Sequence, residues 1–256
     1  MSDAQRSEER SPHPQARPGL GALTARVRGH GQQVAVGVGV LLVVLGTAGF
    51  LGVLDAVQEA EDLAALDDPV LTALAAGRSD VLTVVLTAIT TVSGPTVLPI
   101  IVLVAALAWG LVRGRWWQAG LLAAAMVVST LVSVAIKGIV ARPRPPVDTM
   151  TVAGVESTYS FPSGHTIGAA TLLLVAGYLA WVRRPAWASL LGWLALIVLG
   201  TGLVGLSRLY LGYHFLTDVT ASVALAVAVL GGVVIVDRRR AVRAAQVTAA
   251  APPTAT

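Results

Sequence analysis

The sequence predicts an all-α fold, a polytopic membrane helix bundle of six transmembrane helices with a short interfacial helical segment. Of the 256 residues, 55% are hydrophobic and only 12% are charged, which is far from the balance of a soluble globular domain. Because lipid offers no partners to backbone polar groups, and because the apolar segments are too long for barrel strands, they must be helices. The six windows lie at 34–54, 96–112, 118–136, 165–182, 186–206 and 215–236.

Both ends of the chain are predicted to be polar tails. The first apolar segment follows 32 mostly polar residues and is long enough to span, so it is expected to stay as an anchor and not to be cleaved as a signal peptide. We therefore expect a disordered N-terminal tail (1–32), a six-helix membrane domain (33–237) and a basic, then disordered, C-terminal tail (238–256).

Arginine is concentrated at the exits of the even-numbered spans. Such basic flanks mark the cytoplasmic side, so both termini are expected in the cytoplasm of a multi-pass inner (plasma) membrane protein. The net charge of +4 mostly reports this orientation, and no nucleic-acid partner is indicated. The flanking residues are Arg113 and Arg115 after the second span, Arg183 and Arg184 after the fourth, and Arg238, Arg239 and Arg240 after the sixth.

The first extracytoplasmic loop is predicted to be acidic and partly helical. Residues 55–80 hold seven carboxylates, and the stretch DDPVLTALAAG predicts a short surface helix with Asp68 as N-cap, Pro69 at the first position and Gly77 at the end. Residues 81–93 are apolar but too short to span, and SGP follows them. They are interpreted as a re-entrant or interfacial segment, with a seventh span as the alternative.

Cations at the outer end of the third span contradict the orientation pattern. Lys137, the only lysine of the sequence, closes this span, and Arg142 and Arg144 follow it. A lone lysine at a helix end commonly keeps its ammonium group in water while its stem lies in lipid. Three positive charges on the outer side call for a further reason.

The stretch PSGH, which begins the fourth span, predicts an anion site. Ser163 is suited to cap the helix, whose first amides carry partial positive charge, and Gly164 lets a ligand approach the backbone. A plain helix start would explain Ser163 but not His165. We expect these three residues to cradle a phosphate-like anion.

A third group lies between the fifth and sixth spans. His214 and Asp218 are four residues apart at a helix start and therefore share a face, with Arg208 nearby. The carboxylate can hold one imidazole nitrogen while the other points at a substrate. An aspartate in the first turn of a span is costly and usually functional.

Together these segments resemble the three-part signature of the type 2 phosphatidic acid phosphatase superfamily. The matching elements are Lys137 with six residues to Arg144 and Pro145, then Pro162, Ser163, Gly164 and His165, then Ser207 and Arg208 with five residues to His214 and three more to Asp218. The resemblance implies metal-independent phosphate release through a phosphohistidine, with His214 as nucleophile, Asp218 as its orienting partner and His165 as general acid. It also implies phosphate binding by Lys137, Arg144, Ser163, Gly164 and Arg208, whereas Arg142 falls outside the pattern.

The expected function is hydrolysis of a lipid phosphate or pyrophosphate at the extracytoplasmic face, a step of lipid metabolism in the cell envelope. The family implies undecaprenyl pyrophosphate, phosphatidylglycerol phosphate or phosphatidic acid as substrates. No metal or other cofactor is expected, because ligand spacings are missing. A phosphotransferase using the same site and a non-catalytic lipid carrier or transporter are the alternatives. Six spans disfavour a soluble acid phosphatase or vanadium haloperoxidase, and neither the choice of lipid nor the oligomeric state can be inferred.

Overall fold

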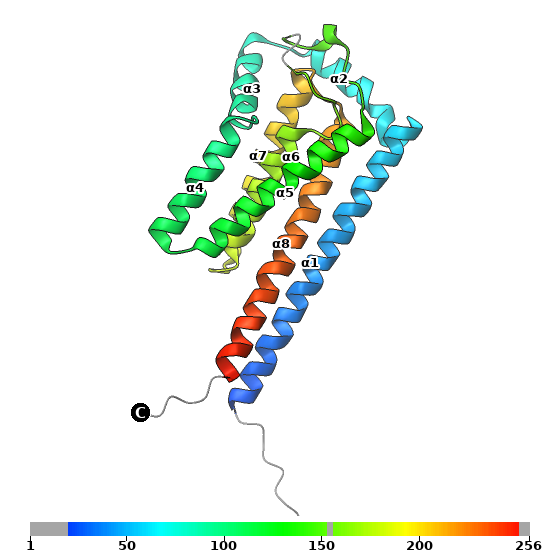
Figure 1. Cartoon of the computed structure of the whole chain (residues 1–256). Helices are drawn as coiled ribbons and strands as arrows, with labels where there is room; N and C mark the ends of the chain where they lie inside the picture. Colours follow the sequence, from blue (N-terminus) through cyan, green and yellow to red (C-terminus); the bar gives the residue numbers. More distant parts are fainter. Residues whose placement is uncertain (1–19, 153–155, 251–256) are drawn as a thin grey trace, which may run out of the picture.

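The computed structural model describes residues 20–152 and 156–250, and within these ranges it is all-helical (Figure 1). The all-α prediction is therefore confirmed. The helices are α1 (Leu20–Glu59), α2 (Asp67–Ala76), α3 (Asp80–Val92), α4 (Val97–Arg113), α5 (Trp116–Val140), α6 (Gly164–Trp181), α7 (Trp187–Tyr210) and α8 (Leu216–Ala250), with short 3-10 helices at Asp62–Leu66 and Val147–Thr149.

Five helices of the described chain are long and apolar enough to cross a membrane by themselves. These are α1, α5, α6, α7 and α8. The second predicted span, 96–112, corresponds to α4, which has only 17 residues and passes the same test only together with α3. The two helices are bent by 53° at the break that contains Gly94 and Pro95. Because Pro95 offers no N–H and disfavours helix in the residue before it, the break lies where SGP predicted it.

Segment 81–93 is joined to α4 across this bend and passes the spanning test only together with it, so it is not a separate seventh span. It forms the 13-residue α3, which begins at Asp80 under a cap from Ser79, whose hydroxyl accepts the Leu82 N–H at 3.4 Å. By length, 13 residues rise only about 20 Å, too little to cross a bilayer alone. The interpretation as a short segment in or near the interface fits this geometry.

The tails are shorter than the predicted boundaries. Helix α1 begins at Leu20 and α8 continues to Ala250, so 20–32 and 238–250 are helical, while 1–19 and 251–256 lie outside the described residues. Neither α1 nor α8 contains a proline, and the arginines and alanines in them favour helix. No residue therefore ends either helix at the membrane surface.

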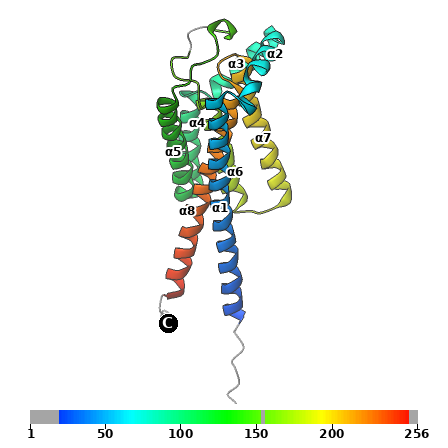
Figure 2. The same cartoon turned by 90° about the vertical axis from the view of Figure 1, so that its right-hand side faces the viewer.

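The two longest helices, α1 and α8, run side by side (Figures 1 and 2). Glycine permits their close approach, since a Cβ on Gly46 would lie 2.5 Å from the Ala228 backbone nitrogen. Likewise, a Cβ on Gly231 would lie 2.5 Å from the Gly39 carbonyl oxygen. Small residues at such contacts are the usual means of packing helices in lipid, where apolar side chains gain little by leaving their surroundings.

Helix α2 begins two residues earlier than predicted. Asp67 is its first residue and Leu66 its N-cap, without a side-chain cap bond, so the assignment of Asp68 as N-cap is wrong. The reason is that Asp67 is buried and accepts hydrogen bonds from another helix, whereas Asp68 is exposed. The end of the helix at Gly77 is confirmed.

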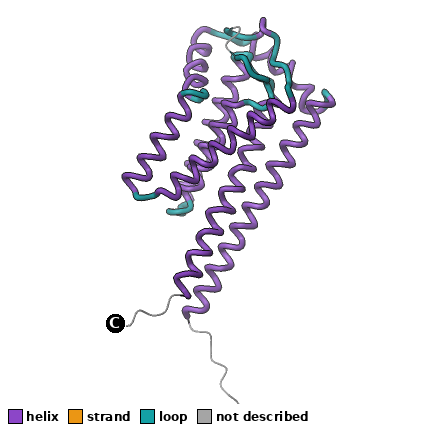
Figure 3. The backbone as a smooth tube through the Cα atoms, viewed as in Figure 1, coloured by secondary structure: helices purple, strands orange, loops and turns teal. Residues whose placement is uncertain are grey.

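The polar motifs gather at one end of the bundle, which we call the site end. It comprises α2, the first turns of α3, and the segments 141–152, 156–163 and 211–215, most of which are loop (Figure 3). The turns between α4 and α5 and between α6 and α7, as well as the start of α1 and the end of α8, lie at the opposite end (Figure 1). All three sequence motifs are therefore brought to the same end.

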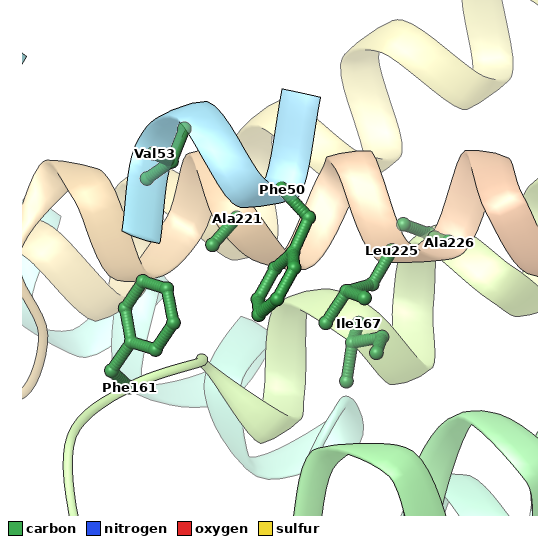
Figure 4. Packing of buried hydrophobic residues seen from close by; sticks show 8 residues of the cluster. Phe50, Val53, Phe161, Ile167, Ala221, Leu225 and Ala226 are labelled. Atoms are coloured by element: carbon green, nitrogen blue, oxygen red, sulfur yellow. The ribbon is translucent and has the colours of Figure 1, made fainter. Parts of the chain in front are cut away.

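A buried apolar cluster fixes the loop that leads into α6 (Figure 4). Phe161 is fully buried between α1, α6 and α8, and its ring centroid lies 5.8 Å from that of Phe50. Ile167 and Leu225 complete the contact. Burying such a side chain is worth about 2 kcal/mol, and it anchors the PSGH stretch immediately after Phe161.

Candidate active site

His214 and Asp218 form a buried pair at the start of α8. The imidazole Nδ1 lies 3.1 Å from Asp218 Oδ2, and both side chains are almost inaccessible. The same oxygen accepts the Phe215 N–H at 2.9 Å and the hydroxyl of Ser160. With three donors on this carboxylate, Nδ1 carries the proton and Nε2 keeps its lone pair. The predicted orienting pair is thus assembled.

The environment keeps His214 neutral. Burial lowers the pKa of His214 to about 4, against the opposing effect of Asp218, and the charges of Arg208 and Arg144 lower it further. A histidine with this pKa is unprotonated at neutral pH. Its Nε2 lies 3.4 Å from Arg144 Nη1, so the free lone pair faces a cation. This is the arrangement that a nucleophile attacking an anion needs.

The turn that carries His214 depends on a glycine. Gly212 has φ +78°, a left-handed conformation that side chains with a Cβ rarely adopt. The Thr149 carbonyl packs directly against its Cα, and the Leu211 carbonyl accepts the Thr151 N–H at 3.0 Å. The segment before PSGH is thereby fastened to the turn before α8.

Two arginines converge beside this histidine. Arg144 is held by the carbonyl oxygens of Thr158 and Tyr213, at 2.6 and 2.8 Å. Arg208 is buried, donates to Thr90 Oγ1 at 2.7 Å, and lies with its guanidinium carbon 4.6 Å from the centre of the Tyr213 ring. These contacts come from three separate parts of the chain, so the two guanidinium groups are fixed before any ligand arrives.

A carboxylate that the sequence analysis missed bridges these two arginines. Glu156 Oε2 accepts from Arg144 Nη2 at 3.0 Å, and its other oxygen pairs with Arg208. Burial opposes ionisation, but the charges of Arg208 and Arg144 outweigh it and lower the pKa of Glu156 below its usual value. The two arginines therefore hold an anion in this structure. The available signal was that Glu156 is the sole carboxylate between Asp148 and Asp218.

Lys137 lies at the edge of the same region. Its ammonium group donates to the Tyr159 carbonyl and, at 3.2 Å, to the Ser160 carbonyl. It shares with Arg144 and Glu156 the lining of a cavity of about 590 Å³ between α5 and the loop. Lys137 is thus close to the predicted site, but its donors are engaged with backbone oxygens of the loop.

The PSGH stretch begins α6 and is bonded to α8. Ser163 is the N-cap of α6, as predicted, and its hydroxyl accepts from Thr166 Oγ1 at 3.0 Å. Its own N–H donates to the Asp218 carbonyl at 3.2 Å, which joins α6 to α8. A Cβ on Gly164 would meet no atom within 4 Å, so its backbone is open to a ligand.

His165 faces a second cavity, of about 410 Å³, next to Arg208 and Glu156. The cavity extends to Gly94 and Pro95 at the break between α3 and α4. His165 thus lines the second cavity with Arg208 and Glu156, whereas Lys137, from α5, lines the first. The structure brings the three motifs together, and Arg142, which also lines the first cavity, pairs with Asp218 and Asp67.

Metal-ligating side chains do not cluster in the described ranges: no group of three or more His, Cys, Asp or Glu residues there could hold a metal ion. The described site brings together a neutral imidazole, a second imidazole and several fixed cations. Such a set can neutralise the oxygens of a phosphoryl group and attack its phosphorus in line.

Comparison with known proteins gives matches in both sequence and structure. The family model described as PAP2 superfamily matches residues 118–241. Phosphatidylglycerophosphatase B of Bacillus subtilis (strain 168) is 42% identical over 72 residues, which cover 27% of this chain and 35% of that protein. The chain thus aligns with only about a third of this curated relative's length.

Two solved structures share the fold. The crystal structure of a transmembrane PAP2 type phosphatidylglycerolphosphate phosphatase from Bacillus subtilis superimposes with a TM-score of 0.65 at 26% identity, over 76% of this chain and 96% of that chain. Aquifex aeolicus LpxE gives a TM-score of 0.50 at 22% identity, over 66% of this chain and 94% of that one. The second similarity concerns the fold alone.

Proposed function

The chain belongs to the PAP2 superfamily through residues 118–241, and from this premise we propose that it is a lipid phosphatase that works through a phosphohistidine on His214. The observation that carries the proposal is the neutral imidazole of His214, whose free Nε2 faces Arg144 while Arg144 and Arg208 together hold a carboxylate. A protein that only bound headgroups would need the cations but not an oriented, unprotonated histidine.

The reaction follows from these positions. A phosphate monoester displaces the Glu156 carboxylate from the two arginines, and the Nε2 lone pair of His214 attacks phosphorus. The bond from phosphorus to the lipid oxygen breaks, and His165 gives a proton to that oxygen, since an alkoxide is a poor leaving group. Water then attacks the phosphohistidine, His165 takes the water's proton, and inorganic phosphate leaves. Lys137, Arg144, Arg208 and the amides of Ser163 and Gly164 are assigned to the phosphoryl oxygens.

The surroundings of the site support a lipid substrate. The cavity beside His165 is also lined by Thr87, Val97 and Val152, and it reaches the break between α3 and α4. A headgroup can enter there while its tails stay among the helices of the membrane region. Among the candidate lipids, the similarity to phosphatidylglycerophosphatase B favours phosphatidylglycerol phosphate.

We place the site end outside the cytoplasm and both termini inside. The supporting observation is that the basic flanks lie away from the site end: Arg113 ends α4, Arg183 follows α6, and Arg238 lies in the part of α8 that leads to its C-terminal end. The chain has no cysteine, so single cysteines can be introduced without background. A cysteine at Ser157 should react with an impermeant thiol reagent in intact cells and one at Arg184 should not, and the reverse pattern would invert the orientation.

The function is tested by phosphate release from purified protein in detergent. The panel contains phosphatidylglycerol phosphate, phosphatidic acid and undecaprenyl pyrophosphate, with His214→Ala as the blank. We expect release above the blank, and protein quenched during turnover should carry acid-labile phosphate on His214. Label on a serine, or equal release by the blank, would contradict the assignment.

A further inference from the structure

A buried chain of charges lies behind the orienting aspartate. We propose that Asp67 and Arg142 are positioning residues, which hold Asp218 so that it fixes the imidazole of His214. The inference rests on the proposed function of His214 as the nucleophile. Neither residue belongs to the three motifs: Arg142 falls outside their spacing, and Asp67 was one of seven carboxylates of a predicted loop.

Arg142 lies at the centre of this series of charged residues. Its Nη1 donates to Asp218 Oδ1 at 2.8 Å and to Thr217 Oγ1 at 2.7 Å, and its Nη2 donates to Asp67 Oδ2 at 2.7 Å. The guanidinium carbon also lies 4.3 Å from the centre of the Phe215 ring. Contacts with two carboxylates, a hydroxyl and an aromatic face leave the guanidinium one orientation.

Asp67 connects α2 to the first turn of α8. Its Oδ1 accepts the Thr217 N–H at 2.9 Å, and its Oδ2 accepts the Thr217 hydroxyl at 2.7 Å. An amide in the first turn of a helix has no partner within the helix, and Asp67 supplies one from a different helix, as a cap residue would. The residue that follows Thr217 is Asp218, so this contact fixes the backbone that carries the orienting carboxylate.

The two oxygens of Asp218 have separate tasks. Oδ1 is bound by Arg142, and Oδ2 faces His214 Nδ1 and the Phe215 N–H. A carboxylate held on one oxygen only can rotate, whereas binding on both fixes its plane and with it the direction of the imidazole. Such supporting groups around a functional histidine commonly change activity by about 10- to 100-fold when they are removed.

Asp67 and Arg142 also affect how strongly the charge of Asp218 acts on His214. Arg142 is shared by two carboxylates, so it offsets only part of the Asp218 charge. Without Arg142, the uncompensated Asp218 favours the protonated imidazole and raises the pKa of His214. Without the Asp67 charge, Arg142 acts on Asp218 alone, so the pKa of His214 should not rise. The other charged groups that face His214 are Arg208 from α7, Arg144 from the loop and His165 from α6, and all remain in place.

The kinetic test compares Arg142→Gln and Asp67→Asn with Asp68→Asn, an exposed neighbour of Asp67. Because neither Arg142 nor Asp67 lies among the phosphate-binding cations, we expect kcat to fall at least about 10-fold while KM stays within about 3-fold. Asp68→Asn should behave as the wild type. Arg142→Lys should recover part of the loss, and the double variant should lose less than the product of the single losses.

A second measurement does not depend on activity. The chain has four histidines, so ¹⁵N-histidine NMR in detergent can follow His214, assigned by its loss in His214→Ala. We expect Arg142→Gln to raise the pKa of His214 by about 1 unit and Asp67→Asn not to raise it. Lost activity with an unchanged His214 titration and a matching loss of thermal stability would show a merely structural role and overturn the proposal. If the wild type releases no phosphate, the proposed function fails, and the NMR result still decides whether Arg142 and Asp67 govern His214.

Discussion

Replacing Glu156 by glutamine should strengthen the binding of phosphate-like anions. In the ligand-free protein the Glu156 carboxylate occupies Arg144 and Arg208, so any phosphoryl group must first displace it. A neutral amide can still accept from one guanidinium but competes far less for both. The variant should therefore bind orthovanadate and substrate more tightly.

The size of the effect follows from the two ion pairs. Hydrogen bonds to charged groups contribute about 1.5 kcal/mol each or more, so the carboxylate holds the arginines with about 3 kcal/mol. Its side chain is 18% exposed, and the displaced carboxylate regains water, which we expect to offset about half of that value. A remainder of about 1.4 kcal/mol corresponds to a roughly 10-fold lower inhibition constant.

The assay measures inhibition of lipid phosphate hydrolysis by orthovanadate, for the wild type and for Glu156→Gln. Asp148→Asn is the matched control, since Asp148 is an exposed carboxylate of the same loop. Its inhibition constant should equal that of the wild type. Weaker inhibition of Glu156→Gln would refute the reasoning and indicate that Glu156 assists ligand binding.

Three further predictions concern the two histidines and the effect of a chelator. His165→Ala should slow hydrolysis of a lipid monophosphate by about 10²- to 10⁴-fold and regain much of that loss with p-nitrophenyl phosphate, whose leaving group needs no proton, whereas His214→Ala should regain nothing; equal losses on both substrates would contradict this division of roles. Activity should persist in EDTA, because none of the proposed steps uses a metal, and loss that magnesium or zinc restores would oppose it. The pKa of His214 is about 4 in the folded protein, against a reference value of 6.5, so the unfolded state binds more protons between these two pH values. The unfolding temperature of the wild type should therefore fall on acidification from pH 6.5 to 4, and that of His214→Ala should fall by less. Identical pH dependence of the two proteins would argue against a buried neutral imidazole.

Much of the fold could be predicted because the local amino-acid composition is enough to identify a membrane helix. The break at Gly94 and Pro95 and the cap at Ser163 were predictable for the same reason, since each depends on a few adjacent residues. The start of α2 was not, because Asp67 is used in a contact with Thr217, 150 residues away. The helical extension of α8 beyond 237 was missed because charge was taken to mark the end of the helix.

The candidate site was predictable where spacing carried information. His214 and Asp218 share one helical turn, and their pairing follows from that alone. Glu156 and the Asp67 contact to Arg142 depend on how distant segments approach each other, and no periodicity records such distances. Arg142 had been set aside because only its position in the motif was considered, whereas its partners become visible only in three dimensions.

Because α1 packs closely against α8, the helix bundle cannot be fully assembled until α8 has been synthesised. The glycine-lined face of α1, with Gly39 and Gly46, is synthesised before its partner α8, which begins only at Leu216. Until then this face must be covered by lipid or by an insertion factor. Asp218 lies on that same helix, so the proposed catalytic pair is incomplete until α8 has been made, and we expect a chain truncated before α8 to be inactive.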